Sequence, residues 1–426
     1  MFAIQHRLGL LSSLTALALL FHPAPAVAQS EEGTATTRGQ QLIGCARGEN
    51  LEVRAQDCSA LIESGAAQGK TLALIYLNRA NALDRLGKEA EALADYAEAL
   101  KLDPGNASVY FNRAIAYERQ RKPKLALADY GRAIEADPKY AEAYVNRAAL
   151  LISGGEAEAA LKDLNTAAVL TPNAPLVYQN RGNAYEALKD HQKALDDYDR
   201  ALRLEPKSAG LLYSKGVALM ELGRDDEAVT AFDQALAMNP KLLPARQTRG
   251  IVRFQKGEWQ KARVDFTAVL AGEPKNRIAL TGLANISMRD KQWQQAVGFL
   301  DRLLAEAPDD GPAFNDRAWS YFNLGELDKA EQDITKALRL SPGNGHIEDT
   351  QGWILCRKGE TAGAEAAFSK ALSLGAPDAR GFQRRLQAAG YYTGAIDGAF
   401  GRGSRAALTA WVGDKCPEAK PAEQDG

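Results

Sequence analysis

The sequence predicts an all-α protein, a solenoid of about nine helix-turn-helix repeats that ends in a small helical C-terminal module. Two observations predict this fold class. Prolines recur every 34 residues, and small residues recur at two other positions of the same period. A fixed period of this length is typical of repeat arrays, in which each repeat packs only against its neighbours. The prolines in phase are Pro104, Pro138, Pro172, Pro206, Pro240, Pro274, Pro308 and Pro342.

Each repeat is expected to contain two antiparallel amphipathic helices. When the repeats begin at residues 73, 107, 141, 175, 209, 243, 277, 311 and 345, the eighth residue is always alanine or glycine and the twentieth is always alanine. Small residues at both positions let two helices cross closely, and apolar residues such as Tyr110 and Tyr117 follow at helical spacing. Glycine at the fifteenth position of six repeats suits the turn between the helices, and the proline ends the second helix.

Residues 73–378 resemble the tetratricopeptide repeat family in their period, their small residues and their closing proline. The resemblance implies helix pairs stacked into a solenoid whose first helices line a groove that binds protein partners. Repeats six, seven and nine depart from the pattern, because Arg246, Arg253, Ser287 and Glu348 replace apolar residues and Ala376 stands at the ninth proline position. We expect looser packing in these repeats.

The segment before the array predicts export. Residues 1–28 contain a basic residue, an apolar run and small residues that end at Ala28, which is typical of a cleavable secretory signal cut after Ala28. A retained anchor is the alternative, but no later stretch reaches the ~20 apolar residues of a spanning helix, so stable membrane insertion is not expected. We expect a periplasmic or secreted protein with a flexible leader at 29–40 and a segment at 41–72 that caps the first repeat.

Four cysteines are candidates for two disulfides, since an even number in an exported chain favours pairing. Three pairings are open. Cys45–Cys58 is favoured because both residues precede the array with twelve residues between them, and Cys356–Cys416 would then tie the C-terminal segment to the last repeat. The spacings contain no CxxC motif and no paired metal-ligand pattern, so we predict neither a metal nor a cofactor.

A second spaced set of residues occupies 379–413: Gln383, Leu386, Gly390, Tyr391, Asp397, Gly398, Phe400, Gly401, Ser404 and Trp411. This spacing resembles the core of the peptidoglycan-binding-like helical domain, and the resemblance implies docking on the cell wall. The chain departs from that family in having Trp411-Val412 in place of a terminal Phe-Gln pair. Two interpretations stay open, a wall-binding module and a helical cap for repeat nine. Residues 414–426 are expected to be disordered.

Charge and residue chemistry argue against nucleic-acid binding and against catalysis. The chain has 52 Lys plus Arg and 54 Asp plus Glu without a basic run, so it lacks the phosphate-neutralising patch of nucleic-acid-binding proteins. His191 and His346 lie in different repeats without an acid–nucleophile spacing around either, which predicts a non-enzymatic protein. Carboxylates such as those of Asp196, Asp197 and Asp199 are expected to face water.

Candidate partner-binding residues lie on the first helices. Asparagine recurs at the sixth position of four repeats, where it can bond an extended peptide; bonding to neighbouring helices is the alternative. These residues are Asn78, Asn112, Asn146 and Asn180. A carboxylate clamp is excluded, because it needs basic residues where Glu142 and Leu176 stand.

Apolar groove residues are expected at the fifth, ninth and twelfth positions, which face the groove in the family's geometry. They include Phe111, Ile115, Tyr213, Phe254, Trp319 and Trp353. Such a groove suits a partner helix or an extended segment, and packing of the twelfth position between repeats is the alternative.

The sequence therefore predicts a non-enzymatic periplasmic scaffold that binds envelope proteins through its repeats, with docking on peptidoglycan through the C-terminal module as a further expectation. Two alternatives are a self-assembling structural protein and a non-catalytic subunit of a wall-modifying complex, with the module acting only as a cap. The identity of the partner and the oligomeric state are left open, because a repeat fold by itself does not determine function.

Overall fold

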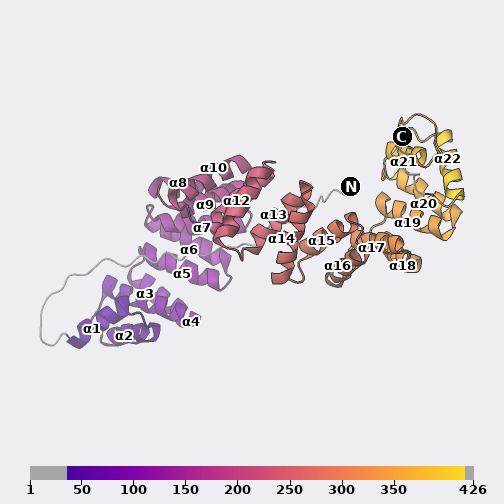
Figure 1. The fold of residues 1–426 in the computed structure, drawn as a ribbon. Coiled ribbons are helices and arrows are strands. Elements are labelled where there is room, and N and C mark those ends of the chain that lie inside the picture. The colour runs from indigo at the N-terminus through magenta and orange to yellow at the C-terminus, as the bar shows by residue number, and fades with distance from the viewer. Residues whose placement is uncertain (1–35, 418–426) are drawn as a thin grey trace. The chain divides into compact units, whose positions relative to one another are not determined.

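The computed structural model describes residues 36–417, and this part of the chain is built from 22 α-helices without a strand. It is the all-α repeat solenoid that the period predicts. The helices fall into two compact units divided between Pro172 and Asn173, and Figure 1 labels the helices of each. The predicted signal segment at 1–28, the start of the leader and the end of the tail lie outside the described residues.

The first unit contains a pair of helices that precedes the array and the first three repeats. Its helices are α1 (Thr36–Arg47), α2 (Leu51–Glu63), α3 (Gly69–Arg85), α4 (Glu89–Leu102), α5 (Ala107–Arg119), α6 (Pro123–Ala136), α7 (Ala141–Ser153) and α8 (Ala157–Leu170). In each repeat the odd-numbered helix is the first helix and the even-numbered helix is the second.

The second unit contains the other six repeats and the C-terminal module. Its repeat helices are α9 (Pro175–Ala187), α10 (His191–Leu204), α11 (Ala209–Glu221), α12 (Asp225–Met238), α13 (Leu243–Gln255), α14 (Trp259–Gly272), α15 (Arg277–Arg289), α16 (Trp293–Glu306), α17 (Gly311–Leu324), α18 (Leu327–Leu340), α19 (Gly345–Lys358) and α20 (Thr361–Ser373). The module consists of α21 (Ala379–Ala388) and α22 (Arg402–Gly413).

The turn inside each repeat requires a left-handed residue at the fifteenth position. Glycine takes this conformation in six repeats, as at Gly87 with φ of 76°. In the other three repeats Arg121, Lys189 and Lys291 adopt φ of 55°, 61° and 57°. A side chain makes this conformation unfavourable by about 1 kcal/mol, so the surrounding helix pair must impose it.

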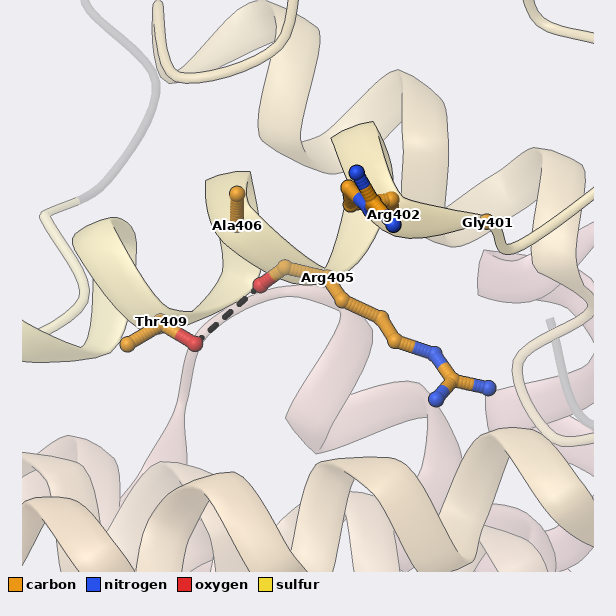
Figure 2. A pocket seen from close by; sticks show the side chains of 5 residues that line it. All are labelled: Gly401, Arg402, Arg405, Ala406 and Thr409. Carbon is orange, nitrogen blue, oxygen red and sulfur yellow. Dashed lines mark hydrogen bonds between the residues drawn. The ribbon is translucent and has the colours of Figure 1, made fainter.

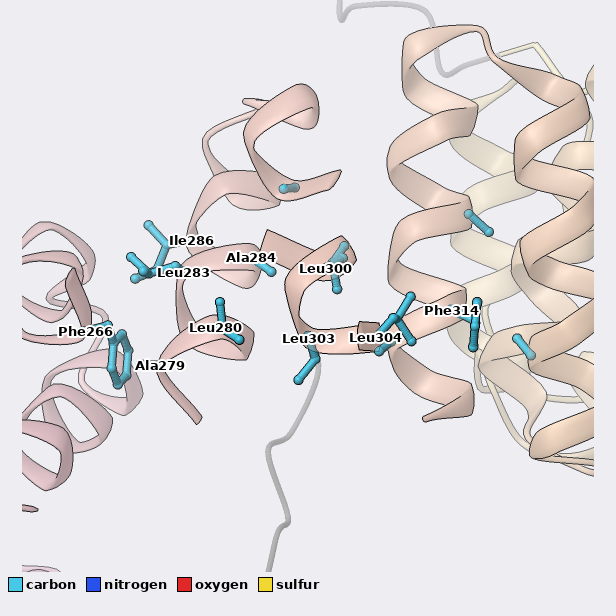
Figure 3. Packing of buried hydrophobic residues seen from close by; sticks show 14 of the residues in the cluster. Phe266, Ala279, Leu280, Leu283, Ala284, Ile286, Leu300, Leu303, Leu304 and Phe314 are labelled. Carbon is cyan, nitrogen blue, oxygen red and sulfur yellow. The ribbon is translucent and has the colours of Figure 1, made fainter. Parts of the chain in front are cut away.

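Small residues at the eighth position leave room for a ring on the second helix. A Cβ placed at Gly216 would lie 2.5 Å from Cε1 of Phe232, and one at Gly182 would lie 2.6 Å from Cε1 of Tyr198. Successive repeats share such rings with their neighbours, since Phe266 also lies against Gly282 of the next repeat. In Figure 3 the buried side chains from Phe266 through Leu280 and Leu300 to Phe314 belong to this shared core.

The polar residues that replace apolar ones in repeats six, seven and nine have partners within the protein. Ser287 is buried and its hydroxyl donates to the Leu283 carbonyl oxygen at 2.7 Å. Glu348 is buried, with Lys370 Nζ 2.5 Å from its Oε1, and Arg253 pairs with Asp265 at 2.9 Å. Arg246 and Arg253 are half-buried, and Arg246 Nη2 donates to the Pro240 carbonyl oxygen at 2.9 Å. Looser packing of these repeats stays a prediction.

Helices α1 and α2 pack on the first repeat and are joined by a disulfide. Cys45 and Cys58 form the bond with their Cα atoms 4.7 Å apart, and with Leu61 and Ile75 of α3 they form one buried cluster. This is the pairing that the sequence favours, and the cluster covers apolar surface at the start of the array.

The C-terminal module shares its core with repeat nine. Phe382, Leu386, Leu408 and Trp411 of the module form one buried cluster with Phe368 of α20. A disulfide joins Cys356 of α19 to Cys416, 60 residues further along the chain, and Arg385 makes a two-bond ion pair with Asp349 at 2.7 and 3.0 Å. No helix among residues 36–417 has the length and apolar character needed to cross a bilayer.

Candidate functional site

An arginine–aspartate pair recurs inside the repeats and was not foreseen from the sequence. Arginine at the seventh position donates through Nε and Nη2 to both carboxylate oxygens of an aspartate at the twenty-third position, on the second helix. In repeat two these bonds, from Arg113 to Asp129, measure 2.6 and 2.8 Å. The pairs are Arg79–Asp95, Arg113–Asp129, Arg147–Asp163, Arg181–Asp197, Arg249–Asp265 and Arg317–Asp333.

These pairs correct one expectation about surface charge. Asp197 does not face water but is buried against Arg181, whereas Asp196 beside it is exposed. Tyrosine rings flank the guanidinium groups, as Tyr110 and Tyr117 do for Arg113 at 5.7 and 5.9 Å. The sequence carried a signal for the pairs, because arginine and aspartate recur sixteen positions apart in the same repeats.

The predicted asparagines are half-buried, and three of them bond within the protein. Asn78 accepts from Arg54 at 3.3 Å, Asn112 donates to the Ser108 carbonyl oxygen at 2.7 Å, and Asn146 donates to the Tyr130 hydroxyl at 3.4 Å. Asn180 is also half-buried. These contacts match the neighbour-bonding alternative in part, while the half-buried amides retain some contact with solvent.

Tyrosine hydroxyls of the second helices also reach the first helices. Tyr96 donates to Asn81 at 2.7 Å and Tyr198 donates to Asn183 at 2.8 Å, so two further asparagines on first helices are hydrogen-bonded. Burial raises the pKa of the Tyr198 hydroxyl well above its usual value, which keeps it a neutral donor. Amide groups on the first helices of repeats one and four are thus bonded to phenol groups of the second helices.

Aromatic residues predicted for the groove are mostly half-buried and pack on other rings. Phe111 lies 4.9 Å from Tyr140, Tyr213 lies 6.0 Å from Phe232, and Phe254 lies 4.9 Å from Trp259 between ring centroids. Ile115, the aliphatic residue of the predicted set, is buried, at 8% exposure. We call the half-buried residues at the fifth, sixth, ninth and twelfth positions of the first helices the first-helix surface.

Trp353 belongs to the junction with the C-terminal module. Its ring centroid lies 5.1 Å from that of Trp411, and the Arg385 guanidinium lies 5.2 Å from its ring centroid. Asp349 and Cys356 on the same helix are likewise bound to the module. The fifth, ninth and twelfth positions of repeat nine are therefore engaged within the chain, which argues against Trp353 as a partner contact.

The motif residues of the module form its own interior. Gln383 is fully buried, where its Nε2 donates to Asp397 at 2.9 Å and its Oε1 accepts from the Gly398 N–H at 2.9 Å. The hydrogen bond from Gln383 and that from the Ala399 N–H lower the pKa of the Asp397 carboxyl. The amide of Gln383 thus holds the loop between α21 and α22 in place.

Other motif residues complete this interior. Leu386, Ser404 and Trp411 are buried, Phe400 packs on Phe382 at 5.7 Å, and the Tyr391 hydroxyl donates to Asp414 at 2.6 Å. The remaining motif glycines lie in the turns, and Gly390 and Gly398 have positive φ. Most of the motif is accordingly directed inward.

An open pocket lies on the outer side of α22. It is lined by Gly401, Arg402, Arg405, Ala406 and Thr409, and Figure 2 shows the Arg405 side chain extending away from the helix. Both arginines are exposed, and the Thr409 hydroxyl donates to the Arg405 carbonyl oxygen at 3.2 Å and to Glu365 of repeat nine at 2.7 Å. Within residues 36–417 no group of His, Cys, Asp and Glu side chains is arranged to hold a metal ion.

Family models assign most of the repeats. Models described as "Tetratricopeptide repeat" match residues 107–140, 175–208, 209–242, 253–316 and 311–344, and one described as "TPR repeat" matches residues 80–120. No curated protein matches the chain.

Several solved structures are similar to parts of the chain. A tetratricopeptide repeat protein from Parabacteroides merdae is 25% identical, with a TM-score of 0.42 over 55% of this chain and 93% of that one. The C-terminal part of a TPR repeat-containing protein from Cytophaga hutchinsonii is 16% identical, with a TM-score of 0.47 over 55% of this chain and 96% of that one. A thermophilic TPR protein from Thermus thermophilus is 22% identical, with a TM-score of 0.36 over 43% of this chain and 99% of that one.

Proposed function

Because tetratricopeptide repeats are present in this chain, we propose that it is a non-enzymatic scaffold that binds a protein partner along its first-helix surface. The observation that carries the proposal is that half-buried amide and aromatic groups recur at the fifth, sixth and twelfth positions of the first helices, as at Tyr213, Asn112, Asn146 and Phe254. Aromatic rings supply apolar contact area, and amides supply hydrogen bonds to a partner backbone.

Site-specific photo-crosslinking tests this surface. A photoreactive benzoylphenylalanine at Phe254, on the first helix of repeat six, is compared with one at Val264, which is exposed on the second helix of the same repeat. We expect one crosslinked partner from the Phe254 site and none of that partner from the Val264 site. Equal crosslinking from both sites, or none from Phe254, would contradict binding through the first helices. Crosslinks between copies of the chain would instead favour self-assembly.

We further propose that the scaffold works outside the cytoplasm, in the periplasm or as a secreted protein. The signal-like composition of residues 1–28 supports this, and so do two disulfides, because disulfides persist in oxidising compartments. Cell fractionation with mass spectrometry of the mature N-terminus is the test. A mature chain beginning at Gln29 in the periplasmic fraction is expected, and an uncleaved cytoplasmic chain with free thiols would refute export.

For the C-terminal module we propose a primary role as the cap of repeat nine, with the exposed face of α22 as the part available to peptidoglycan. The shared core with Phe368 supports the cap, and exposed Arg402 and Arg405 offer positive charge to the carboxylates of wall peptides.

Sedimentation with purified peptidoglycan sacculi tests the second part of this proposal. A variant carrying Arg402→Ser and Arg405→Ser leaves the shared core intact, whereas a truncation would expose it. Cosedimentation of the wild type that the double variant loses would support docking on peptidoglycan. Failure of the wild type to cosediment would leave the module a cap, as would equal cosedimentation of both proteins.

A further inference from the structure

Repeat eight carries a carboxylate that has no cationic partner among residues 36–417. Asp316 lies at the sixth position of α17, where repeats one to four have asparagine. It is half-buried, and burial raises the pKa of its carboxyl to about 7. Within residues 36–417 no lysine, arginine or histidine forms an ion pair with it, although the buried Asp333 of the same repeat is paired with Arg317. Burying a carboxylate without a counter-charge costs free energy, which distinguishes Asp316 from the paired Asp333.

The neighbouring groups do not supply enough hydrogen-bond donors. Asn315, only 4% exposed, donates through Nδ2 to Asp316 Oδ1 at a long 3.4 Å, and its own Oδ1 has no partner. At the same position of repeat three, the Asn146 side chain has a hydrogen-bond partner on the preceding helix, the Tyr130 hydroxyl. Asp316 lacks a partner of this kind. At the matching site before repeat eight the residue is Leu300, which has no polar group.

Aromatic rings lie next to this acceptor pair along the same helix. Trp319 is one turn beyond Asp316, half-buried and stacked on Phe322 with a centroid distance of 5.1 Å and an interplanar angle of 17°. The rings of this region already attract cations within the chain, since the Arg357 guanidinium lies 4.8 Å from the Phe322 centroid. Trp319 thus places an aromatic ring, a group that attracts cations, one helical turn from Asp316.

We propose that Asp316, with Asn315 and Trp319, binds a lysine or arginine side chain of the protein partner. This inference rests on the proposed function, because it assigns a chemical preference to the first-helix surface. A cationic donor supplies the counter-charge that Asp316 lacks, and a guanidinium has enough N–H groups to reach Asn315 as well. An acidic or wholly apolar segment would leave the carboxylate uncompensated, so the site selects against such segments.

The test is a selection of peptides from a random phage library on the full mature chain, made in parallel on Asp316→Asn and on Asp309→Asn. Asp309 lies in the exposed turn before α17, so its variant removes the same charge outside the site. We expect the wild type and Asp309→Asn to select peptides with lysine or arginine at one fixed position, and Asp316→Asn to lose that preference. Selected peptides without a basic preference, or an unchanged preference on Asp316→Asn, would overturn the inference while leaving the scaffold proposal intact. No selected peptide at all would overturn both.

A double-mutant cycle then locates the contact. A selected arginine peptide is compared with its citrulline counterpart, which has nearly the same shape without the charge, on the wild type and on Asp316→Asn. Citrulline should weaken binding to the wild type about tenfold or more and leave binding to Asp316→Asn almost unchanged. Equal losses on both proteins would show that the arginine binds elsewhere and would refute the assignment.

Discussion

Arg113 on α5 and Asp129 on α6 form a two-bond ion pair, with Nε and Nη2 lying 2.6 and 2.8 Å from the two carboxylate oxygens. Asp129 is only 3% exposed, and the bond to Asp129 raises the pKa of the Arg113 guanidinium. The same pair in five other repeats joins the first helix to the second at the same two positions of the repeat.

Breaking this pair should destabilise repeat two. Arg113→Met leaves the Asp129 carboxylate buried without its partner, and such a loss costs about 3–5 kcal/mol. Hydrogen exchange of α5 and α6 measures the effect locally, because repeat arrays need not unfold in one step. Lys124→Met on the exposed side of α6 removes the same charge and should change little. Equal exchange rates in both variants would mean that the pair does not hold the helices together.

An added methyl group should have opposite effects at two glycines, Gly216 at the helix crossing and Gly298 on the exposed side of α16. Gly216→Ala places its Cβ 2.5 Å from the Phe232 ring, so we expect a loss of about 1–3 kcal/mol in unfolding free energy. At Gly298, inside α16, an added Cβ would have no atom within 4 Å outside the backbone of its own helix and its chain neighbours, so Gly298→Ala should stabilise the protein by about 0.5–1 kcal/mol. Urea denaturation compares the two variants, and a stabilising Gly216→Ala would show that the ring moves aside freely.

The Asp316 carboxyl predicts a pH-dependent stability. Its pKa rises from 3.8 to about 7 in the folded protein, so its stabilising contribution is present below about pH 4 and is lost as the pH rises toward 7. Asp316→Asn should therefore raise Tm near pH 8 and have little effect near pH 4. Thermal unfolding at both pH values is the measurement, with Asp309→Asn as the control. A Tm difference that is the same at both values would contradict the raised pKa.

The disulfide between Cys356 and Cys416 should hold the module on repeat nine. The bond closes a loop across 60 residues, and the chain-entropy relation gives about 4 kcal/mol for a loop of this length. In Cys356→Ala with Cys416→Ala, hydrogen exchange of α21 and α22 should rise. The control is Cys45→Ala with Cys58→Ala, which should raise hydrogen exchange in α1 and α2 instead. Faster exchange in α1 and α2 of the first variant, or in α21 and α22 of the control, would contradict this local effect.

Gln383 should act through the module's fold. Gln383→Met leaves the Gly398 N–H and the Asp397 carboxylate without their buried partner, which costs about 1–3 kcal/mol. Hydrogen exchange in the loop at residues 391–401 is expected to increase. Gln387→Met on the exposed side of the same helix should not alter it. An ordered loop in Gln383→Met would reopen a direct ligand-binding role for this residue.

The sequence by itself determined the helices and their pairing, because their signals are local and repeated. The 34-residue period, the small residues at the crossing and the proline ends act within one repeat, and a neighbour of the same pattern completes the core. The turns with glycine were predicted for the same reason. Arg121, Lys189 and Lys291 take the same left-handed conformation without any propensity for it, so there the packed helix pair decides.

Tertiary structure decided which polar and aromatic groups are available to a partner. Asp197 is acidic and lies in a charged run, but the helix crossing places it under Arg181, away from water. Trp353 has the phase of a groove residue, yet Trp411 covers it, because the module folds back onto the last repeat. Asp316 has the apolar Leu300 sixteen positions before it, on the preceding helix, where Asn146 of repeat three has Tyr130 as a hydrogen-bond partner. Burial and charge compensation depend on contacts between helices, so periodicity within the sequence could not reveal them.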